Sequence, residues 1–268
     1  MADDLHSQPF LIDVLCLNAA RLQPQWAAPT VTEDGNETTL QTNYLSPFLL
    51  VHLLLSRVTE RIVLTTSGLH EKVEVDDVVV HPYNDDSDNS FLANYHYKRA
   101  YAQSKFYLVS LCASLAEQQQ QNGVTITCFS PGLVPGTGLF RDNPELVSGH
   151  HPPPVPNRSV AWGGGALVYM ALAKATTGAA SASTYWSTHV GSDPATDYGQ
   201  HFTAVSIRDR VAPRVRQAVW NMSRERTGIV VTSSTVASSM LPTSKTDDED
   251  DDDESSSNGT DEAVTIAG

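Results

Sequence analysis

Two strand-like runs on either side of a helix-like segment constrain the fold of this chain most strongly. Residues 61–67 and 124–132 are rich in apolar and β-branched residues, and each run ends in small or hydroxyl-bearing residues. Between them, the segment 106–115 has apolar residues at the three- and four-residue spacing of a helix: Leu108, Leu111, Cys112 and Leu115. This order predicts a βαβ unit, in which polar residues that follow the strands meet at the carboxyl edge of a parallel sheet.

Tyr101 and Lys105 stand where the predicted helix begins. Residues four positions apart lie on one face of a helix, and an ammonium beside a phenol favours the phenolate. Such a pair can transfer a proton nearer neutral pH than the ordinary tyrosine pKa of about 10 allows. Because Tyr-x-x-x-Lys also occurs by chance, the alternative is an ordinary surface pair. The predicted position of Ser67, Pro131 and Gly132 at the neighbouring strand ends favours a functional site.

Further motifs surround this unit in a fixed order. The chain carries Asn18-Ala19-Ala20, Asn43, Ser67, Tyr101-x-x-Ser104-Lys105 and Pro131-Gly132. Over roughly residues 10–230, this order resembles the short-chain dehydrogenase/reductase superfamily. The runs 13–20, 32–39 and 43–50 are similar to the retinol dehydrogenase and WW-domain oxidoreductase group, and the runs 136–141 and 184–187 to light-dependent protochlorophyllide reductase. The resemblance implies an α/β fold, a three-layer Rossmann-like doubly wound parallel sheet.

The resemblance also implies four catalytic roles. Tyr101 would donate the proton, and Lys105 would lower its pKa and hold the ribose of the cofactor. Ser67 would donate a hydrogen bond to the substrate carbonyl, although a serine that closes a turn is the alternative. Asn43 would hold a water molecule in a proton relay, unless it is a solvated polar residue. Pro47 follows within one turn of Asn43 and is expected to kink the helix at a cost of about 3 kcal/mol, which would disturb the relay.

A nicotinamide cofactor follows from the same resemblance. Asn18, Ala19 and Ala20 would pack beneath it, the backbone at Pro131 and Gly132 would contact the nicotinamide, Thr137 would contact its amide, and Tyr101 and Lys105 would complete the cofactor site. NADP(H) is expected, with NAD(H) left open. Relatives carry a glycine-rich pyrophosphate loop well before the Asn-Ala motif, whereas only 17 residues precede Asn18 here. We therefore expect an N-terminally truncated domain whose first strand is an exposed edge.

Two functions remain open. The first is hydride transfer between NADP(H) and a carbonyl, an alcohol or an activated double bond of a small hydrophobic substrate, retinol-like or protochlorophyllide-like. The second is a catalytically inactive remnant that acts as a binding or scaffold protein. The missing glycine-rich loop is what keeps the second interpretation open.

The remaining elements are predicted from hydrophobic patterns. We expect strands at 10–17 and 183–187 and a helix at 162–174. The family resemblance implies a further helix at 36–55. The basic amphipathic segment 208–226 is typical of a membrane-surface or partner-binding helix, but docking on the sheet is the preferred interpretation. Gly163-Gly164-Gly165 is not predicted to bind phosphate, because no strand precedes it.

The charge is concentrated at the C-terminus. The net charge is −14, and residues 241–268 contribute −9 of it through ten acidic residues and one lysine. We expect residues 1–230 to form a partial domain and 231–268 a disordered acidic tail, a candidate for binding a protein partner. The body has no basic stripe, which argues against nucleic-acid binding.

Several site types and compartments are disfavoured. Cys16, Cys112 and Cys128 lie in apolar runs and are expected to be buried free thiols of a reducing compartment. No metal site is expected: residues 70–96 read as an exposed acidic loop, and His150-His151 as a solvated one. No run of 18 apolar residues predicts a membrane span. Residues 1–9 do not resemble a targeting signal, so the cytoplasm is the default, with an organelle open if the N-terminus is incomplete.

Overall fold

A sheet of five strands forms the centre of the part of the chain that the structure describes. The computed structural model describes residues 10–74, 95–119, 122–148, 157–174, 184–188, 202–207 and 211–230, so the predicted tail and His150-His151 lie outside the described residues. The strands are β1 (Ile12–Leu17), β2 (Val58–Thr65), β3 (Thr125–Phe129), β4 (Thr184–Thr188) and β5 (Phe202–Ser206). The α-helices are α2 (Thr38–Leu40), α3 (Ser46–Leu54), α6 (Tyr97–Gln118), α7 (Val160–Leu172) and α8 (Pro213–Thr227). Shorter helical turns are η1 (Gln41–Leu45, a π-helix) and the 3₁₀ turns η2 (Leu55–Arg57), η3 (Gly68–Lys72), η4 (Gly138–Phe140) and η5 (Pro144–Leu146).

The strands follow one another across the sheet in chain order. The pairs β1–β2, β2–β3 and β3–β4 are parallel, which confirms the predicted βαβ arrangement. The strand β5 was not predicted, and it pairs with β4 in the antiparallel direction along its whole length. The sheet is therefore parallel with one antiparallel edge strand, a common variant of the open α/β sheet.

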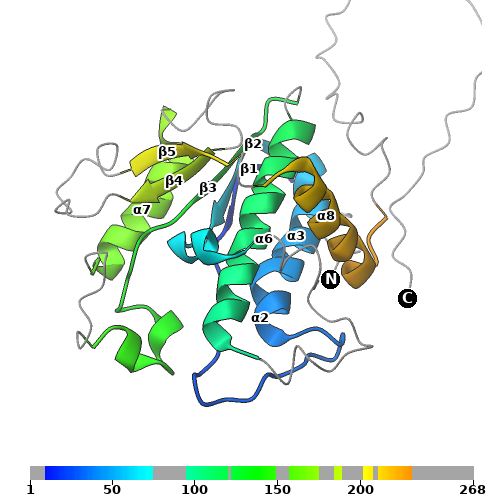
Figure 1. Ribbon diagram of the computed structural model, residues 1–268. Coiled ribbons are helices and arrows are strands. Elements are labelled where there is room, and N and C mark those ends of the chain that lie inside the picture. The colour runs from blue at the N-terminus through cyan, green and yellow to red at the C-terminus, as the bar shows by residue number, and fades with distance from the viewer. Residues whose placement is uncertain are drawn as a thin grey trace, which may run out of the picture.

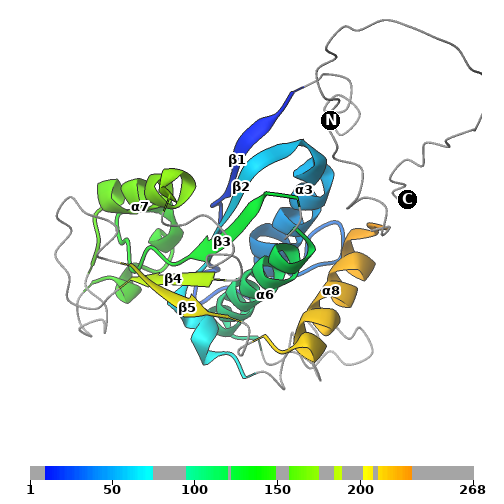
Figure 2. The same cartoon turned by 90° about the horizontal axis from the view of Figure 1, so that it is seen from above.

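Alternating side chains divide the protein into three layers, as predicted. On β2, Ile62 and Leu64 belong to the same buried cluster as residues of α3, α6 and α8. Val63, which points to the opposite face because side chains of a strand alternate, packs with Trp162 and Met170 of α7. Figures 1 and 2 show α7 on one side of the sheet and α3, α6 and α8 on the other.

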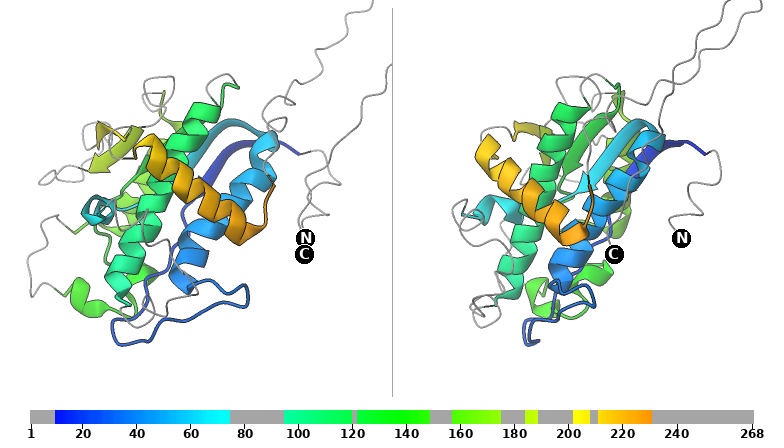
Figure 3. Two further views of the ribbon diagram at one scale, coloured as in Figure 1. Left: turned by 45° about the vertical axis from the view of Figure 1, so that its right-hand side comes forward. Right: turned by 90° about the vertical axis from the view of Figure 1, so that its right-hand side faces the viewer.

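The basic helix α8 docks on other helices rather than on the sheet itself. It runs across α6 and the segment that contains α3, as Figure 3 shows. Its apolar residues Val215, Val219 and Met222 are buried in the cluster of that layer. The expected docking on the sheet was wrong in this respect. Because the apolar face is covered, the structure does not support the alternative of a membrane-surface helix.

A buried hydrogen bond fastens α8 to η1. The side-chain oxygens of Tyr44 and Ser223 lie 2.6 Å apart. The hydroxyl of Ser223 donates to the carbonyl of Val219, which leaves the Tyr44 phenol as the donor to Ser223. Both side chains are buried, so the phenol has no water to replace a lost acceptor.

Replacing Ser223 with alanine is expected to lower the free energy of unfolding by about 1–3 kcal/mol, because it leaves the buried Tyr44 hydroxyl without its acceptor. Tyr44→Phe is the matched control and should cost less, since it removes the donor and leaves Ser223 bonded to Val219. Urea denaturation of the two variants measures both values. A smaller loss for Ser223→Ala than for Tyr44→Phe would contradict this account.

The cysteines differ in exposure. All three are free thiols, and Cys112 and Cys128 are buried as predicted, but Cys16 is exposed. The prediction for Cys16 was wrong because β1 lies at the edge of the sheet. On β1, Val14 packs against the α7 cluster, whereas Cys16 does not belong to that cluster.

Cys16 is expected to be the first thiol to react with a disulfide reagent in the native protein. Burial around the thiol raises its pKa, so the reaction should be slower than that of a free cysteine. Stopped-flow labelling with a chromogenic reagent measures the rate, and Cys16→Ser should remove the fast phase. A fast phase that survives in Cys16→Ser would show that a buried cysteine becomes accessible.

The strand β1 pairs on one side only among the described residues. Its partner is β2, and its other edge has no strand within the described part of the chain. Leu11, just before β1, is 60% exposed. This confirms that the first strand is an edge, as expected from its position in the sequence.

Candidate functional site at the carboxyl edge of the sheet

The carboxyl ends of β1, β2 and β3 lie next to one another. The hydroxyl of Thr65 at the end of β2 donates a 2.9 Å hydrogen bond to the side-chain oxygen of Asn18, which follows β1. The backbone N–H of Thr66 donates to the carbonyl of Phe129 on β3 at 2.8 Å. Asn18, Ser67 and the residues after Phe129 therefore share one edge of the sheet, where open α/β sheets bind ligands.

Helix α6 brings Tyr101 and Lys105 to this edge. The helix begins at Tyr97, one turn earlier than predicted, so Tyr101 lies within the helix and not at its start. The ammonium nitrogen of Lys105 is 5.5 Å from the centre of the Tyr101 ring, in line with the four-residue spacing. The side chain of Ser67 lies near the phenol of Tyr101 and lowers its pKa. The three predicted catalytic residues Ser67, Tyr101 and Lys105 are thus brought together.

Lys105 is anchored in a dry environment. Only 1% of the residue is exposed, and its Nζ donates a 2.9 Å hydrogen bond to the carbonyl of Thr65. Burial lowers the pKa of Lys105 to about 7, because removal from water disfavours the charged amine. The amine is therefore divided between its charged and neutral forms near neutral pH.

The phenol of Tyr101 experiences two opposing effects. Burial raises its pKa above the ordinary value, and the side chain of Ser67 acts in the opposite direction. Lowering of this pKa by the Lys105 ammonium stays a prediction. The neighbour that lowers the pKa of Tyr101, and so favours its phenolate, is Ser67.

Asn43 is held at the site by hydrogen bonds to the backbone of Arg21 and to the side chain of Ser104. Its amide nitrogen donates to the carbonyl of Arg21 at 2.9 Å and to the hydroxyl of Ser104 at 3.1 Å, and its oxygen accepts from the N–H of Arg21 at 2.7 Å. Ser104 in turn donates to the carbonyl of Tyr101 at 2.7 Å. Asn43 is fully buried, so the alternative of a solvated polar residue is wrong. The predicted role of Asn43 in holding a water molecule of a proton relay does not depend on this burial and stays a prediction.

The expected kink at Pro47 takes the form of a π-helical turn. In η1 the N–H of Ser46 bonds to the carbonyl of Gln41, five residues earlier, instead of four. Pro47 then stands in the first turn of α3, where its missing N–H is tolerated. The turn that precedes the proline thus absorbs the distortion, and Asn43 within it keeps all three hydrogen bonds.

The segment after β3 carries the predicted nicotinamide contacts. Gly132 has a φ of 78°, a left-handed conformation that favours glycine. Its N–H donates to the hydroxyl of Ser130 at 3.3 Å. The hydroxyl of Thr137 donates to the carbonyl of Val134 at 3.0 Å, so it is engaged within its own turn. Pro131 and Gly132 lie at the carboxyl edge of the sheet, directly after the strand that pairs with β2.

An apolar cluster surrounds the ring of Tyr101. Leu22 and Tyr97 are buried with it, and the partly buried side chains packed against them come from several loops: Tyr95, Leu139, Phe140 and Leu146. Asn143 fixes the last of these loops, since its side chain donates to the carbonyl of Gln23 at 3.0 Å and accepts from the N–H of Gln25 at 2.8 Å. A ligand that reaches Tyr101 therefore meets a mainly apolar wall.

The residues at this edge fit the nicotinamide end of a dinucleotide. Asn18 and Ala19 are exposed and small, which leaves the end of β1 open beside Lys105. A pyrophosphate usually binds where a glycine-rich turn leads from a strand into a helix. Gly163, Gly164 and Gly165 do not form such a turn, because they lie inside α7, as predicted. The described residues thus fit the half of the cofactor that takes part in the chemistry.

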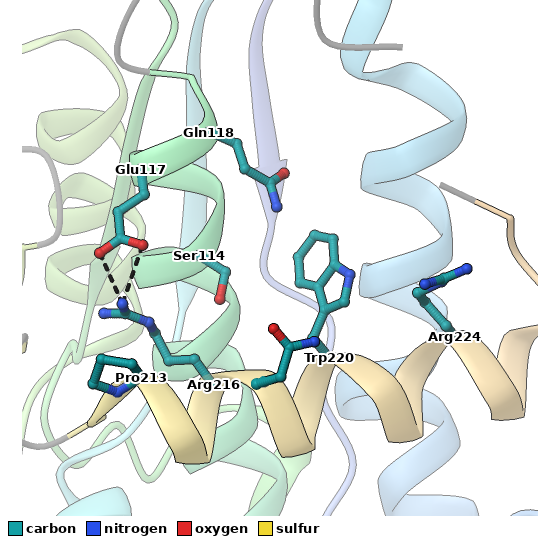
Figure 4. A pocket seen from close by; sticks show the side chains of 8 residues that line it. Ser114, Glu117, Gln118, Pro213, Arg216, Trp220 and Arg224 are labelled. Atoms are coloured by element: carbon teal, nitrogen blue, oxygen red, sulfur yellow. Dashed lines mark hydrogen bonds and ion pairs between the residues drawn. The ribbon is translucent and has the colours of Figure 1, made fainter. Parts of the chain in front are cut away.

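Other features lie apart from this edge. Within the described ranges, no three His, Cys, Asp or Glu residues gather as a metal site. A depression of about 290 Å³ lies at the surface between α6 and α8, and its lining includes the ion pair of Arg216 and Glu117, 2.9 Å apart (Figure 4). It is lined by Ser114, Glu117, Gln118, Pro213, Arg216, Gln217, Trp220 and Arg224, none of which belongs to the predicted site. No helix in the part of the chain that the structure describes is both long and apolar enough to cross a membrane.

Known structures share the fold. A crystal structure of an uncharacterized protein from Mycobacterium paratuberculosis matches 84% of this chain and 70% of its own chain, with a TM-score of 0.56 and 20% sequence identity. A likeness at this identity shows the common architecture. No protein-family model matches the chain.

Sequence comparison finds relatives that match part of this chain. The chain is 34% identical to mouse retinol dehydrogenase 13 over 128 residues, which are 46% of this chain and 35% of the relative. It is 33% identical to the short-chain dehydrogenase TIC 32 A of Brassica napus over 122 residues, 41% of this chain and 36% of the relative. It is 28% identical to the protochlorophyllide reductase of Daucus carota over 168 residues, 53% of this chain and 41% of the relative. The chain is thus similar in sequence to parts of proteins of the short-chain dehydrogenase/reductase superfamily.

The chain matches only part of each of those relatives. It spans between 35% and 42% of the length of the curated relatives first matched. The relatives named are retinol dehydrogenases, protochlorophyllide reductases and short-chain dehydrogenases, which agrees with the resemblance of the motifs.

Sequence reasoning missed two residues of this site. Residues 70–96 were expected to form an exposed loop, but His70 is only 1% exposed and lies against the backbone of Ser67. Ser104 was predicted only as part of the Tyr-x-x-Ser-Lys motif, with no role of its own. In the structure its hydroxyl links the side chain of Asn43 to α6. The spacing of three residues between Ser67 and His70 was a signal for a helical turn.

Proposed function

We propose that this chain carries the proton-transfer site of an oxidoreductase that moves hydride between NADP(H) and a carbonyl, an alcohol or an activated double bond. One observation carries the proposal: the hydroxyls of Ser67 and Tyr101 and the amine of Lys105 gather at the carboxyl edge of a parallel sheet. The family relationship supports the reaction type. The preference for NADP(H) over NAD(H) belongs to the same proposal.

The roles of the residues follow from their positions. In the direction of reduction, a bound nicotinamide supplies hydride to the substrate carbon. The Tyr101 hydroxyl gives its proton to the substrate oxygen, and the Ser67 hydroxyl donates a hydrogen bond to the same oxygen. Lys105, held by the carbonyl of Thr65, stabilises the phenolate that remains and binds the ribose. Asn43 keeps the loop after β1 against α6 through Arg21 and Ser104.

A small hydrophobic substrate fits the surroundings of Tyr101. The wall of leucine and aromatic side chains around the ring offers few polar partners, so binding energy there comes mainly from burial of apolar surface. Relatives are named for retinol and protochlorophyllide, both largely apolar molecules. We therefore propose a retinoid-like or tetrapyrrole-like substrate. Residues 1–230 form the partial enzyme domain in this proposal, and 231–268 an acidic tail outside it.

The test is NADPH-dependent reduction of retinal and of protochlorophyllide. It uses the chain itself and a chimaera in which the glycine-rich N-terminal segment of a retinol dehydrogenase precedes Phe10. We expect turnover by the chimaera, faster with NADPH than with NADH. The chain by itself should bind NADPH weakly in titration calorimetry, because the described residues fit only the nicotinamide end.

The alternative is a protein without catalytic activity that acts in binding or as a scaffold. A folded chimaera that binds NADPH but reduces neither substrate, nor a panel of other apolar aldehydes and ketones, would contradict the proposed enzyme and favour this alternative. Low-micromolar binding of NADPH by the chain itself would instead contradict the expected weakness of its cofactor site.

A further inference from the structure

The backbone carbonyl of Ser67 is held by the turn that follows it. Ser67 caps the 3₁₀ turn η3, where its hydroxyl oxygen accepts a 3.3 Å hydrogen bond from the N–H of Leu69. Its carbonyl accepts from the N–H of His70 at 3.1 Å. Hydrogen bonds of a 3₁₀ turn have poorer geometry than those of an α-helix, so these two contacts alone hold Ser67 weakly.

The side chain of His70 adds a shorter bond to the same carbonyl. Its Nδ1 lies 2.7 Å from the carbonyl oxygen of Ser67. A carbonyl oxygen can only accept a hydrogen bond, so Nδ1 must carry a hydrogen. The neutral imidazole of His70 is therefore the tautomer with hydrogen on Nδ1. The carbonyl of Ser67 thus accepts from both the backbone and the side chain of one residue.

The imidazole of His70 is itself fixed by the sheet. Its ring stands edge-on to the ring of Tyr185, with centres 4.6 Å apart and an interplanar angle of 78°. Tyr185 belongs to β4 and pairs with Cys128 of β3. His70 is 1% exposed, so its position is set by packing rather than by solvent. It therefore connects a rigid strand to the peptide of Ser67.

We propose that His70 is a positioning residue for Ser67, which holds the Ser67 peptide so that its hydroxyl stays directed at Tyr101. This inference rests on the proposed function, because it assigns His70 to the same reaction site. The direction of the hydroxyl depends on the backbone of Ser67, and a displacement of about 1 Å can cost on the order of 10²-fold in rate. If the ring of His70 only filled space, the hydrogen bond from Nδ1 to the Ser67 carbonyl would not be required.

Two substitutions separate positioning from packing. His70→Asn keeps an N–H donor at a position close to that of Nδ1 and loses most of the ring. His70→Phe keeps a ring against Tyr185 and loses the donor. Positioning predicts that the asparagine variant behaves like the unchanged protein, whereas packing predicts that the phenylalanine variant does.

In the active chimaera, His70→Phe is expected to lower kcat by about 10–100-fold with the KM for NADPH unchanged, and His70→Asn to stay within about threefold. The KM is expected to hold because His70 contacts Ser67 and not the predicted cofactor residues. The reverse order of the two variants, or equal kcat values in both, would overturn the proposal.

A second measurement does not depend on activity. In the chain itself, ¹⁵N spectra of the His70 ring should show hydrogen on Nδ1. The ¹³Cζ signal of Tyr101, assigned by its loss in Tyr101→Phe, should shift in His70→Phe and stay in place in His70→Asn. Hydrogen on Nε2 alone, or an unshifted Tyr101 signal in His70→Phe, would overturn the proposal even in an active enzyme. The expected spectra in a chimaera without turnover would instead contradict only the proposed function.

Discussion

Replacing Tyr101 with phenylalanine is expected to lower the turnover of the active chimaera by about 10²–10⁴-fold, the usual contribution of a positioned acid. The substitution keeps the ring within its cluster of Leu22 and Tyr97 and removes only the hydroxyl, whose pKa is lowered by the side chain of Ser67. The affinity for NADPH should stay the same, because the phenol acts on the substrate oxygen. Steady-state kinetics and calorimetry measure the two quantities.

Tyr97→Phe is the matched control for this experiment. Tyr97 lies one turn earlier on α6 and in the same cluster, and its hydroxyl makes only a 3.5 Å contact with the side chain of Gln25. Its turnover should change far less than that of Tyr101→Phe. Equal activity of Tyr101→Phe and the unchanged chimaera would exclude Tyr101 as the proton donor.

The free energy of unfolding is expected to rise between about pH 7 and pH 10, because of Lys105. Burial lowers its pKa in the folded protein to about 7, whereas the unfolded chain keeps the ordinary value near 10.4. In this interval the unfolded state binds a proton that the folded state has released, so stability increases with pH. Below about pH 7 both states are charged and the full cost of burying the amine is present. One pKa unit corresponds to about 1.4 kcal/mol, so the rise should amount to several kcal/mol.

Lys105→Met should remove this rise, and urea denaturation at several pH values measures it. The variant loses the bond to the carbonyl of Thr65 but no longer buries an amine. Lys98→Met, on the exposed part of the same helix, serves as the control and should keep the rise. A rise of the same size in Lys105→Met would show that another group is responsible. In the active chimaera, Lys105→Met should weaken both turnover and NADPH binding.

The central βαβ unit and the arrangement of Tyr101 and Lys105 were predictable because they depend on local patterns. Apolar runs of about seven residues specify strands buried on both faces, and the spacing of four on a helix places two side chains on one face. The burial of Lys105 was not predictable in this way. It depends on the packing of α6 against β2, which brings Nζ to the carbonyl of Thr65.

The errors have identifiable physical causes. The strand β5 has only five residues, too few for a clear hydrophobic pattern, and it is separated from its partner β4 along the chain by residues 189–201. Cys16 was expected to be buried because its run is apolar, but an edge strand is covered less than a central one. The proline at position 47 was expected to disturb Asn43, and the π-helical turn before it accommodates the strain. His70 was missed because burial of a polar residue after a strand depends on the neighbouring strand β4.

Within the described residues, one edge of β1 has no partner strand, and this has a consequence for assembly. Backbone groups along such an edge are available to a further strand. A strand added there in the parallel direction would end beside Asn18, and the turn after it would reach the site from the side opposite Pro131 and Gly132. A segment that pairs with β1 at this edge would add residues to the reaction site. Catalytic activity would then depend on whether this extra strand is present in the sheet.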